Sequence, residues 1–134
     1  MFTREYNSFK VGNRDNITVS FLDTEEDKYA LQNFLFSETH NFREEIVAAL
    51  DAVLSGRRDT IDFSGNMSAC EGNAQEVEVY FNYMEEELGP SVFMPTIKLK
   101  ELVDEWIEME DKFRRGELDG KLPLVIEDED SPFI

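Results

Sequence analysis

The chain has 134 residues and a formal net charge of -17 at pH 7, from 30 Asp and Glu against 13 Lys and Arg. Such a charge repels nucleic acid and anionic membranes, and it attracts cationic partners. The hydrophobic fraction of 41%, with 11 phenylalanines, excludes a disordered acidic tail, because disorder combines high charge with low hydrophobicity.

The sequence predicts two β-strands within residues 2–22. Gly12-Asn13 and Asp15-Asn16 mark the turn between them. In the second strand apolar residues alternate with polar ones, which is the pattern of a strand with one buried face. The apolar residues are Ile17, Val19 and Phe21.

Two helices are predicted next. Thr24, with Asp27 three residues later, indicates the start of a short helix with an apolar face of Leu31, Phe34 and Leu35. Asn41, with Glu44 at the third helical position, is the expected cap of a clearer helix. Gly56 ends this helix in a left-handed conformation. Its apolar residues recur at spacings of three and four: Phe42, Ile46, Val47, Leu50, Val53 and Leu54.

From Thr60 the hydrophobic period becomes two, as in a β-sheet. Short strands are expected at 60–63 and 67–70, with turns at 64–66 and at Gly72-Asn73. A further strand follows, in which Val77, Val79 and Phe81 form the buried face. Its exposed face carries Glu76, Glu78, Tyr80 and Asn82.

After a turn at Gly89-Pro90, residues 92–94 form another short strand, and Thr96 caps a long helix that ends at Gly116. Trp106 belongs to the buried stripe of this helix rather than to a binding site. The stripe consists of Leu99, Leu102, Val103, Trp106, Ile107 and Phe113. Residues 122–126 are a last apolar segment.

These elements predict an α+β fold in which helices pack on one face of an antiparallel sheet. We expect a single domain over residues 1–134, with residues 127–134 as an acidic tail prone to fraying. The single cysteine, Cys70, cannot form an internal disulfide and is expected to be buried filler. The N-terminus has no apolar run typical of a signal peptide, and no segment has the roughly 18 apolar residues of a membrane span. A cytoplasmic location is therefore expected.

The sequence gives little support for catalysis, so we expect a protein that is not an enzyme. His40 is the only histidine, and its i, i+4 spacing to Glu44 supplies two metal ligands without an obvious third. The glycines are scattered, so there is no phosphate-binding loop, and the acidic segments lack the spacing of a calcium-binding loop. No cofactor, no metal and no catalytic residue is predicted.

The acidic residues are concentrated in one stretch. Between Arg58 and Lys98, 39 residues contain eight carboxylates and no Lys or Arg, which is nearly half of the net charge. Tyrosines among carboxylates suit recognition of a basic protein, because aromatic side chains supply contact area and the charges speed encounter. The predicted partner-binding residues are Glu76, Glu78, Tyr80, Tyr83, Glu85, Glu86 and Glu87. The carboxylates Asp59, Asp62 and Glu71 flank predicted turns and are interpreted as merely solvated.

The order of three segments resembles bacterial immunity proteins of contact-dependent growth inhibition systems, over residues 60–115. The segments are Asp62-Phe-Ser-Gly-Asn66, then Glu76-Val-Glu-Val-Tyr80, then Pro95-Thr96 leading into Leu99-Lys-Glu-Leu102-Val-Asp-Glu-Trp106. The resemblance implies a cytoplasmic protein that binds and blocks the C-terminal toxin domain of a secreted effector. Such toxins are often nucleases.

The leading hypothesis is therefore an immunity protein that neutralises a basic toxin, with a nuclease domain as the expected toxin, by stoichiometric binding through its acidic surface. An alternative is an acidic mimic of nucleic acid, or a regulator, that acts on a host nucleic-acid-binding protein. A third interpretation is a small enzyme that uses paired carboxylates, and it is the least favoured because an excess of acids makes any one pair uninformative.

Overall fold

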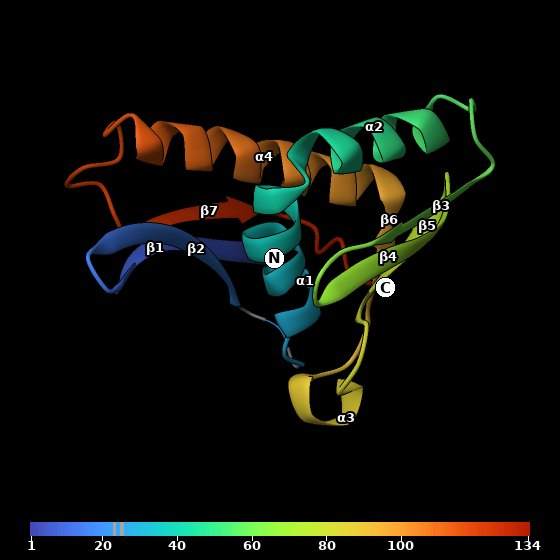
Figure 1. The fold of residues 1–134 in the computed structure, drawn as a ribbon, viewed down its shortest axis with the longest axis horizontal. Coiled ribbons are helices and arrows are strands. Elements are labelled where there is room, and N and C mark those ends of the chain that lie inside the picture. The colour runs from blue at the N-terminus through green and yellow to red at the C-terminus, as the bar shows by residue number, and fades with distance from the viewer. Residues whose placement is uncertain (23, 25) are drawn as a thin grey trace.

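The computed structural model describes residues 1–22, 24 and 26–134, and it contains two antiparallel sheets. A three-stranded sheet has the order β2-β1-β7, and a four-stranded sheet has the order β3-β4-β5-β6. Figure 1 shows the two sheets at opposite sides of the molecule. The strands are β1 (Phe2–Val11), β2 (Arg14–Leu22), β3 (Thr60–Ser64), β4 (Ser68–Asn73), β5 (Glu76–Phe81), β6 (Val92–Pro95) and β7 (Leu124–Asp128).

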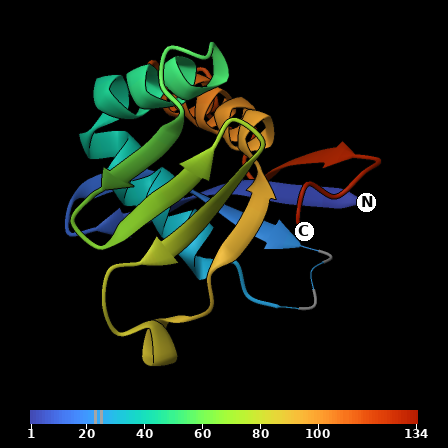
Figure 2. The same ribbon diagram turned by 90° about the vertical axis from the view of Figure 1, so that its right-hand side faces the viewer.

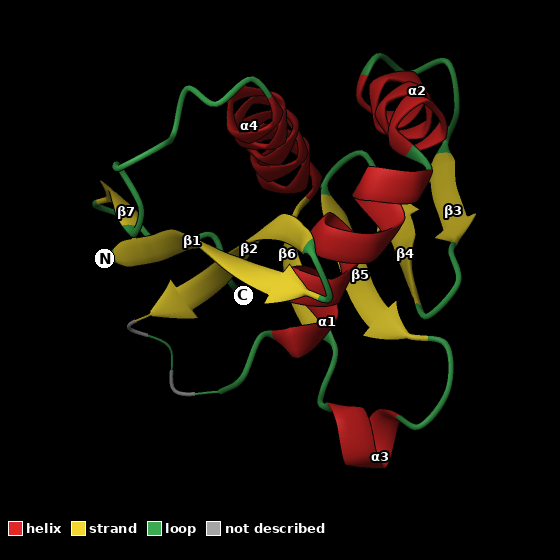
Figure 3. Cartoon of the chain, turned by 60° about the vertical axis from the view of Figure 1, so that its left-hand side comes forward, coloured by secondary structure: helices red, strands yellow, loops and turns green. Residues whose placement is uncertain are grey.

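The helices join these sheets into one body. Helices α2 and α4 lie side by side along one side of both sheets, and α1 runs between the sheets (Figures 1 and 3), where it contacts β2 and β5. The elements are α1 (Tyr29–Asn33), which continues into the π-helix η1 (Phe34–Thr39), then α2 (Arg43–Leu54), α3 (Glu85–Leu88) and α4 (Thr96–Arg114). Within the described residues, no helix has the length and apolar character needed to cross a membrane.

One hydrophobic core contains side chains from both sheets and from α1, η1, α2 and α4. Trp106 belongs to this core, fully buried and stacked on Tyr6 with ring centroids 6.3 Å apart. The interpretation of Trp106 as a core residue is confirmed. Cys70 is also buried, and burial raises the pKa of its thiol to about 12, so the thiol stays protonated.

The predicted α+β class with antiparallel strands is confirmed, but the strands form two sheets where the pattern indicated one. The hairpin of β1 and β2 pairs with the distant strand β7, with Arg4 opposite Ile126 in the register, and not with any of β3 to β6. The strands β3 to β6 pair only with their neighbours in sequence. Hydrophobic alternation identifies strands and does not reveal which distant strand each one joins.

The predicted helix caps are wrong in all three cases. Helix α1 begins at Tyr29, with Lys28 as N-cap and no side-chain cap, so Thr24 has no capping role. Asn41 does not cap α2, because η1 runs almost directly into it: the Phe42 amide donates to the carbonyl of Glu38 at 2.7 Å. Thr96 is the first helical residue, and its hydroxyl donates instead to the carbonyl of Asn73 at 2.7 Å.

The turn predicted at Gly72-Asn73 lies two residues later, because β4 continues to Asn73. The Asn73 side chain closes the turn by accepting hydrogen bonds from the amides of Gln75 and Glu76, at 2.9 and 3.1 Å. The stop glycines Gly56 and Gly116 have the predicted positive φ of 81° and 77°.

Residues 127–134, the acidic tail predicted to be prone to fraying, contact the rest of the fold in this structure. Glu127 and Asp128 belong to β7 and pair with β1. Phe133 packs edge-on against Phe2 at 5.4 Å, and the Ile134 amide donates to the carbonyl of Phe93 at 2.9 Å. These contacts could not be predicted from the acidic run itself, because the aromatic residue that packs against β1, Phe133, follows it in the sequence.

A buried carboxylate fixes the end of the four-stranded sheet. Glu38, on η1, has no exposed surface and accepts hydrogen bonds from the turn between β3 and β4. Its Oε1 accepts from the Asn66 amide at 2.8 Å, and its Oε2 accepts from the Ser68 amide at 3.2 Å and the Ser68 hydroxyl at 2.5 Å. Several donors offset the cost of burying the charge, so η1 holds this turn in place.

Candidate partner-binding surface

Strand β5 has the predicted two faces. Val77, Val79 and Phe81 are buried, while Glu76 is exposed and Glu78 and Tyr80 are half-buried. The helices cover the inner face of the sheet, and Figure 2 looks onto its outer face. This predicted alternation is confirmed.

The register of the strands adds two carboxylates to this outer face, Asp62 and Glu71, which the sequence pattern indicated to be merely solvated. Asp62 on β3 lies opposite Glu71 on β4, and Glu71 lies opposite Glu78 on β5. Glu78 in turn lies opposite Phe93 on β6, whose side chain is 43% exposed. Directly opposed residues share a face, so one row crosses the whole sheet. We call Asp62, Glu71, Glu78 and Phe93 the acidic row.

Tyr80 lies beside this row. It sits opposite the small, buried Ala69, and its hydroxyl donates to Oε1 of Glu71 at 3.2 Å. Burial, the hydrogen bond to Glu71 and the negative charges of Glu71, Asp62 and Glu78 raise the pKa of Tyr80 to about 12. The phenol therefore remains neutral among these negative charges. Tyr80 thus adds an uncharged aromatic ring to a face that otherwise carries carboxylates.

The carboxylates of the outer face have no cationic partner in the described part of the chain. None of the ion pairs there includes Asp62, Glu71, Glu76 or Glu78. Like charges directly opposite each other in a sheet are destabilising. This face therefore carries a charge arrangement that the fold itself does not need.

The carboxylates of α4 contrast with this face, because most of them are paired. Glu105 forms a fork with Arg4 at 2.5 and 2.7 Å and accepts from the Tyr6 hydroxyl at 2.7 Å. Glu110 lies 2.7 Å from Arg43 and 2.6 Å from Nδ1 of His40. His40 thus contacts Glu110 rather than Glu44, which was its partner in the predicted two-ligand spacing. These charges bind α4 to the rest of the fold.

The remaining predicted residues lie beyond the end of β5. The Tyr83 side chain is 53% exposed and its hydroxyl donates to the carbonyl of Asn66 at 3.5 Å, next to the turn between β3 and β4. Glu86 and Glu87 are exposed on α3, which projects from the sheet in Figures 1 and 2. The side chain of Glu85 lies outside what the structure describes. The structure thus separates these glutamates from the acidic row.

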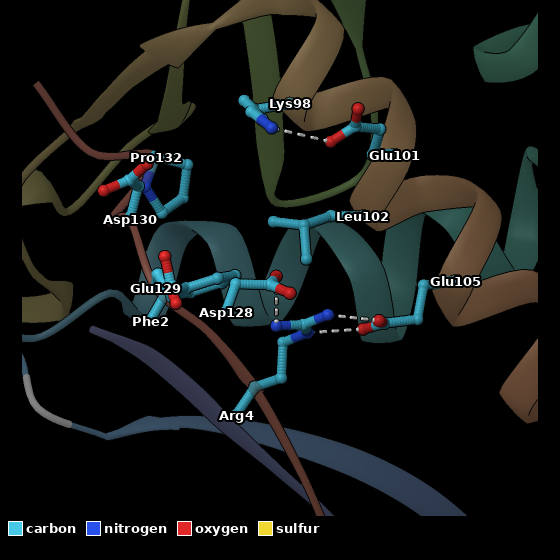
Figure 4. Close-up of a pocket in the computed structure, with 10 residues that line it drawn as sticks. All are labelled: Phe2, Arg4, Lys98, Glu101, Leu102, Glu105, Asp128, Glu129, Asp130 and Pro132. Carbon is cyan, nitrogen blue, oxygen red and sulfur yellow. Dashed lines mark hydrogen bonds and ion pairs between the residues drawn. The ribbon is translucent and has the colours of Figure 1, made fainter.

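A cavity of about 310 Å³ lies on another part of the surface, between the start of β1, the first half of α4 and the segment after β7. Figure 4 shows Arg4 reaching Glu105 and Asp128 at its base, with Lys98 paired to Glu101 at its rim. Because these charges are largely satisfied by one another, the arrangement is a structural ion-pair network. Among the described residues, no group of three or more His, Cys, Asp or Glu side chains is arranged to hold a metal ion.

Comparison of the chain with protein-family models, with curated protein sequences and with solved structures gave no match in any of the three. Functional inference therefore depends on the geometry and charge of the chain itself.

Proposed function

We propose that the protein is an inhibitor that binds a basic protein domain in a one-to-one complex through the outer face of its four-stranded sheet. The observation that supports this most directly is the acidic row, whose carboxylates lack cationic partners within the described chain. Unpaired charges on one face raise the rate of encounter with an oppositely charged protein.

The aromatic side chains of the same face supply apolar contact area, which charged groups alone do not provide. Tyr80 is held beside Glu71, and the exposed ring of Phe93 ends the row. Binding energy in protein interfaces comes mainly from a few desolvated aromatic or arginine anchors, surrounded by contacts that contribute little individually. A partner that covers Tyr80 and Phe93 would desolvate two such anchors and place its cations against the row.

The class of partner that fits best is a nuclease toxin. A nuclease active site is positively charged because it holds phosphates, so an acidic inhibitor can block it by covering that charge. Such inhibition needs no catalytic group in the inhibitor. Together with the resemblance of residues 60–115 to contact-dependent growth inhibition immunity proteins, this supports a bacterial, cytoplasmic immunity protein that neutralises the C-terminal toxin domain of a secreted effector.

The test uses the toxin domain encoded beside this gene. We expect a one-to-one complex that blocks nuclease turnover, with an association rate that falls as salt is raised. The variant Glu71→Lys/Glu78→Lys should associate about tenfold more slowly. The matched variant Glu86→Lys/Glu87→Lys carries the same charge change on α3 and should associate more nearly like the parent.

Melting temperatures of both variants provide the folding control. Absence of a complex at low salt would exclude the proposal. A complex in which the α3 variant is the slower of the two would move the binding surface from the acidic row to the end of β5. Binding to host nucleic-acid-binding proteins, without binding to the toxin domain, would favour a nucleic-acid mimic instead.

A further inference from the structure

Strand β3 is an outer strand of the four-stranded sheet, so one of its edges is not paired with another strand. Figure 2 shows it at the border of the sheet, at the opposite side from β6. The edge of a sheet presents backbone donors and acceptors that can pair with an added strand. Asp62, the first carboxylate of the acidic row, lies in the middle of this strand.

The hydrogen bonds of the β3–β4 turn show which groups point outward. The Gly65 amide donates to the carbonyl of Ser68 at 2.9 Å, so these two residues form a hydrogen-bonded pair. Bonded and non-bonded pairs alternate along antiparallel strands. Ser64, Asp62 and Thr60 therefore direct their backbone N–H and C=O groups away from β4. Within the described chain these outward groups have no hydrogen-bond partner.

A groove accompanies this edge. It has a volume of about 260 Å³ and lies between β3 and one side of α2. The helix contributes only alanines to it, Ala48, Ala49 and Ala52, and the loop before β3 contributes Arg58 at one end of the strand. Because alanine side chains are short, they leave room beside β3 for the side chains of an additional strand.

We propose that the edge of β3 receives an extended segment of the basic partner as a fifth strand of the sheet. This inference rests on the proposed function, and it specifies how the partner is held. In the added strand, the residue opposite Asp62 would share the outer face with the acidic row and is therefore Lys or Arg. Its two neighbours point to the inner face, towards the alanines of α2, and are therefore small and apolar.

A second copy of this chain does not fit the same edge. Pairing of two β3 strands would place acidic sheets side by side, each from a chain with a net charge of -17. Like charges across paired strands are destabilising. The partner strand is therefore one that alternates basic and small apolar residues.

The probe is a synthetic peptide of about seven residues in which lysine and alanine alternate, a length typical of a paired strand. Its control has the same composition with the lysines and alanines in two blocks. Amide hydrogen exchange is measured by NMR with each peptide. We expect the alternating peptide to slow exchange at Thr60, Asp62 and Ser64, and the block peptide to leave these amides unchanged.

Two pairs of variants identify the interaction. Asp62→Pro removes one outward N–H, a change that edge strands tolerate, and Asp62→Asn removes the charge but keeps the N–H. Ala48→Leu narrows the groove at an exposed helical position, and Ala48→Ser leaves it open. Asp62→Pro should bind the alternating peptide about tenfold more weakly than Asp62→Asn. Ala48→Leu should likewise bind it more weakly than Ala48→Ser.

The same exchange measurement on the complex with the toxin domain separates the two proposals. If the domain binds while the three β3 amides exchange as before, strand addition is wrong and the inhibitor proposal stands. If the alternating peptide protects these amides but no basic toxin domain binds, the edge site stands and the inhibitor proposal fails. Equal binding of both peptides without protection, or binding of neither, overturns strand addition.

Discussion

Glu38 and Gly65 are in direct contact, and a Cβ atom added at residue 65 would overlap the Glu38 side chain. Glu38 is fully buried and cannot move without giving up its hydrogen bonds to the β3–β4 turn. The requirement for glycine at this position therefore comes from a neighbouring helix and not from the conformation of the turn alone.

The first prediction concerns Gly65→Ala, which should lower the free energy of unfolding by about 2 kcal/mol through overpacking and a displaced carboxylate. Urea denaturation monitored by Trp106 fluorescence measures this change. Asn66→Ala is the matched control, because residue 66 contributes only its backbone amide to Glu38. Similar stability of Gly65→Ala and the parent would contradict the close contact.

Replacement of Glu38 tests the same unit from its other side. Glu38→Gln should lower the free energy of unfolding by about 1–3 kcal/mol, because the amide NH₂ would face donors that now bond to a carboxylate. The cost should remain in high salt, since the group is buried. Recovery of parental stability in salt would contradict a buried hydrogen-bonded charge.

The third prediction concerns pH. The pKa of Tyr80 is raised from the ordinary value of 10.0 to about 12, so the unfolded chain loses this proton at a lower pH than the folded chain does. The stabilisation by Tyr80 is present below pH 10 and is lost as pH rises towards 12. Tyr80→Phe should lack this loss of stability, and Glu71→Gln should lower the pKa of Tyr80. Tyrosinate absorbance and thermal melts across this range provide the measurement.

The fourth prediction is that the acidic row reduces stability. Glu78→Gln removes one of two carboxylates directly opposite each other in β4 and β5 and should raise the free energy of unfolding by about 0.5 kcal/mol at low salt. Glu101→Gln removes a carboxylate that pairs with Lys98 at 3.2 Å and should give no such gain. If Glu78→Gln also slows association with the partner, this face exchanges stability for binding.

The last prediction compares two arginines. Arg4, with a side chain 7% exposed, pairs with Glu105 and Asp128, and Arg4→Met should lower the free energy of unfolding by about 3 kcal/mol because it leaves Glu105 without its cation. Arg115 pairs with Glu117 at the surface, and Arg115→Met should have no measurable effect. Chemical denaturation of both variants tests whether burial decides the outcome.

Local sequence patterns predicted the three longer helical segments, two of their stop glycines and the strands β1 to β6, but not α3, the pairing of β7 as a strand, or any N-cap. The alternation of Val77, Val79 and Phe81 predicted strand β5, and the apolar stripe around Trp106 predicted helix α4. Both patterns exist because burial of one face imposes a period on the sequence. The predicted N-caps were wrong because the hydrogen-bond partner of a polar side chain can lie far along the chain. Thr96 donates to Asn73 on β4, which no nearby spacing could indicate.

The candidate surface was only partly predictable for a related reason. Glu76, Glu78 and Tyr80 follow from the alternation of β5, but Asp62 and Glu71 join them through strand register. A signal was present, since Asp62 alternates with Ile61 and Phe63 and so belongs to the polar side of its strand. The number of residues in each hairpin loop then fixes which carboxylates face each other.

The pairing of β1 with β7 joins residues at the two ends of the described chain, with Phe2 opposite Asp128. The strands β3, β4, β5 and β6, in contrast, meet their neighbours through connections within residues 60–95. Closure of a long loop is slow compared with formation of adjacent hairpins. During synthesis the acidic sheet can therefore pair its strands while the C-terminal strand is still being made, and the hydrogen bond from the Ile134 amide to Phe93 is added afterwards.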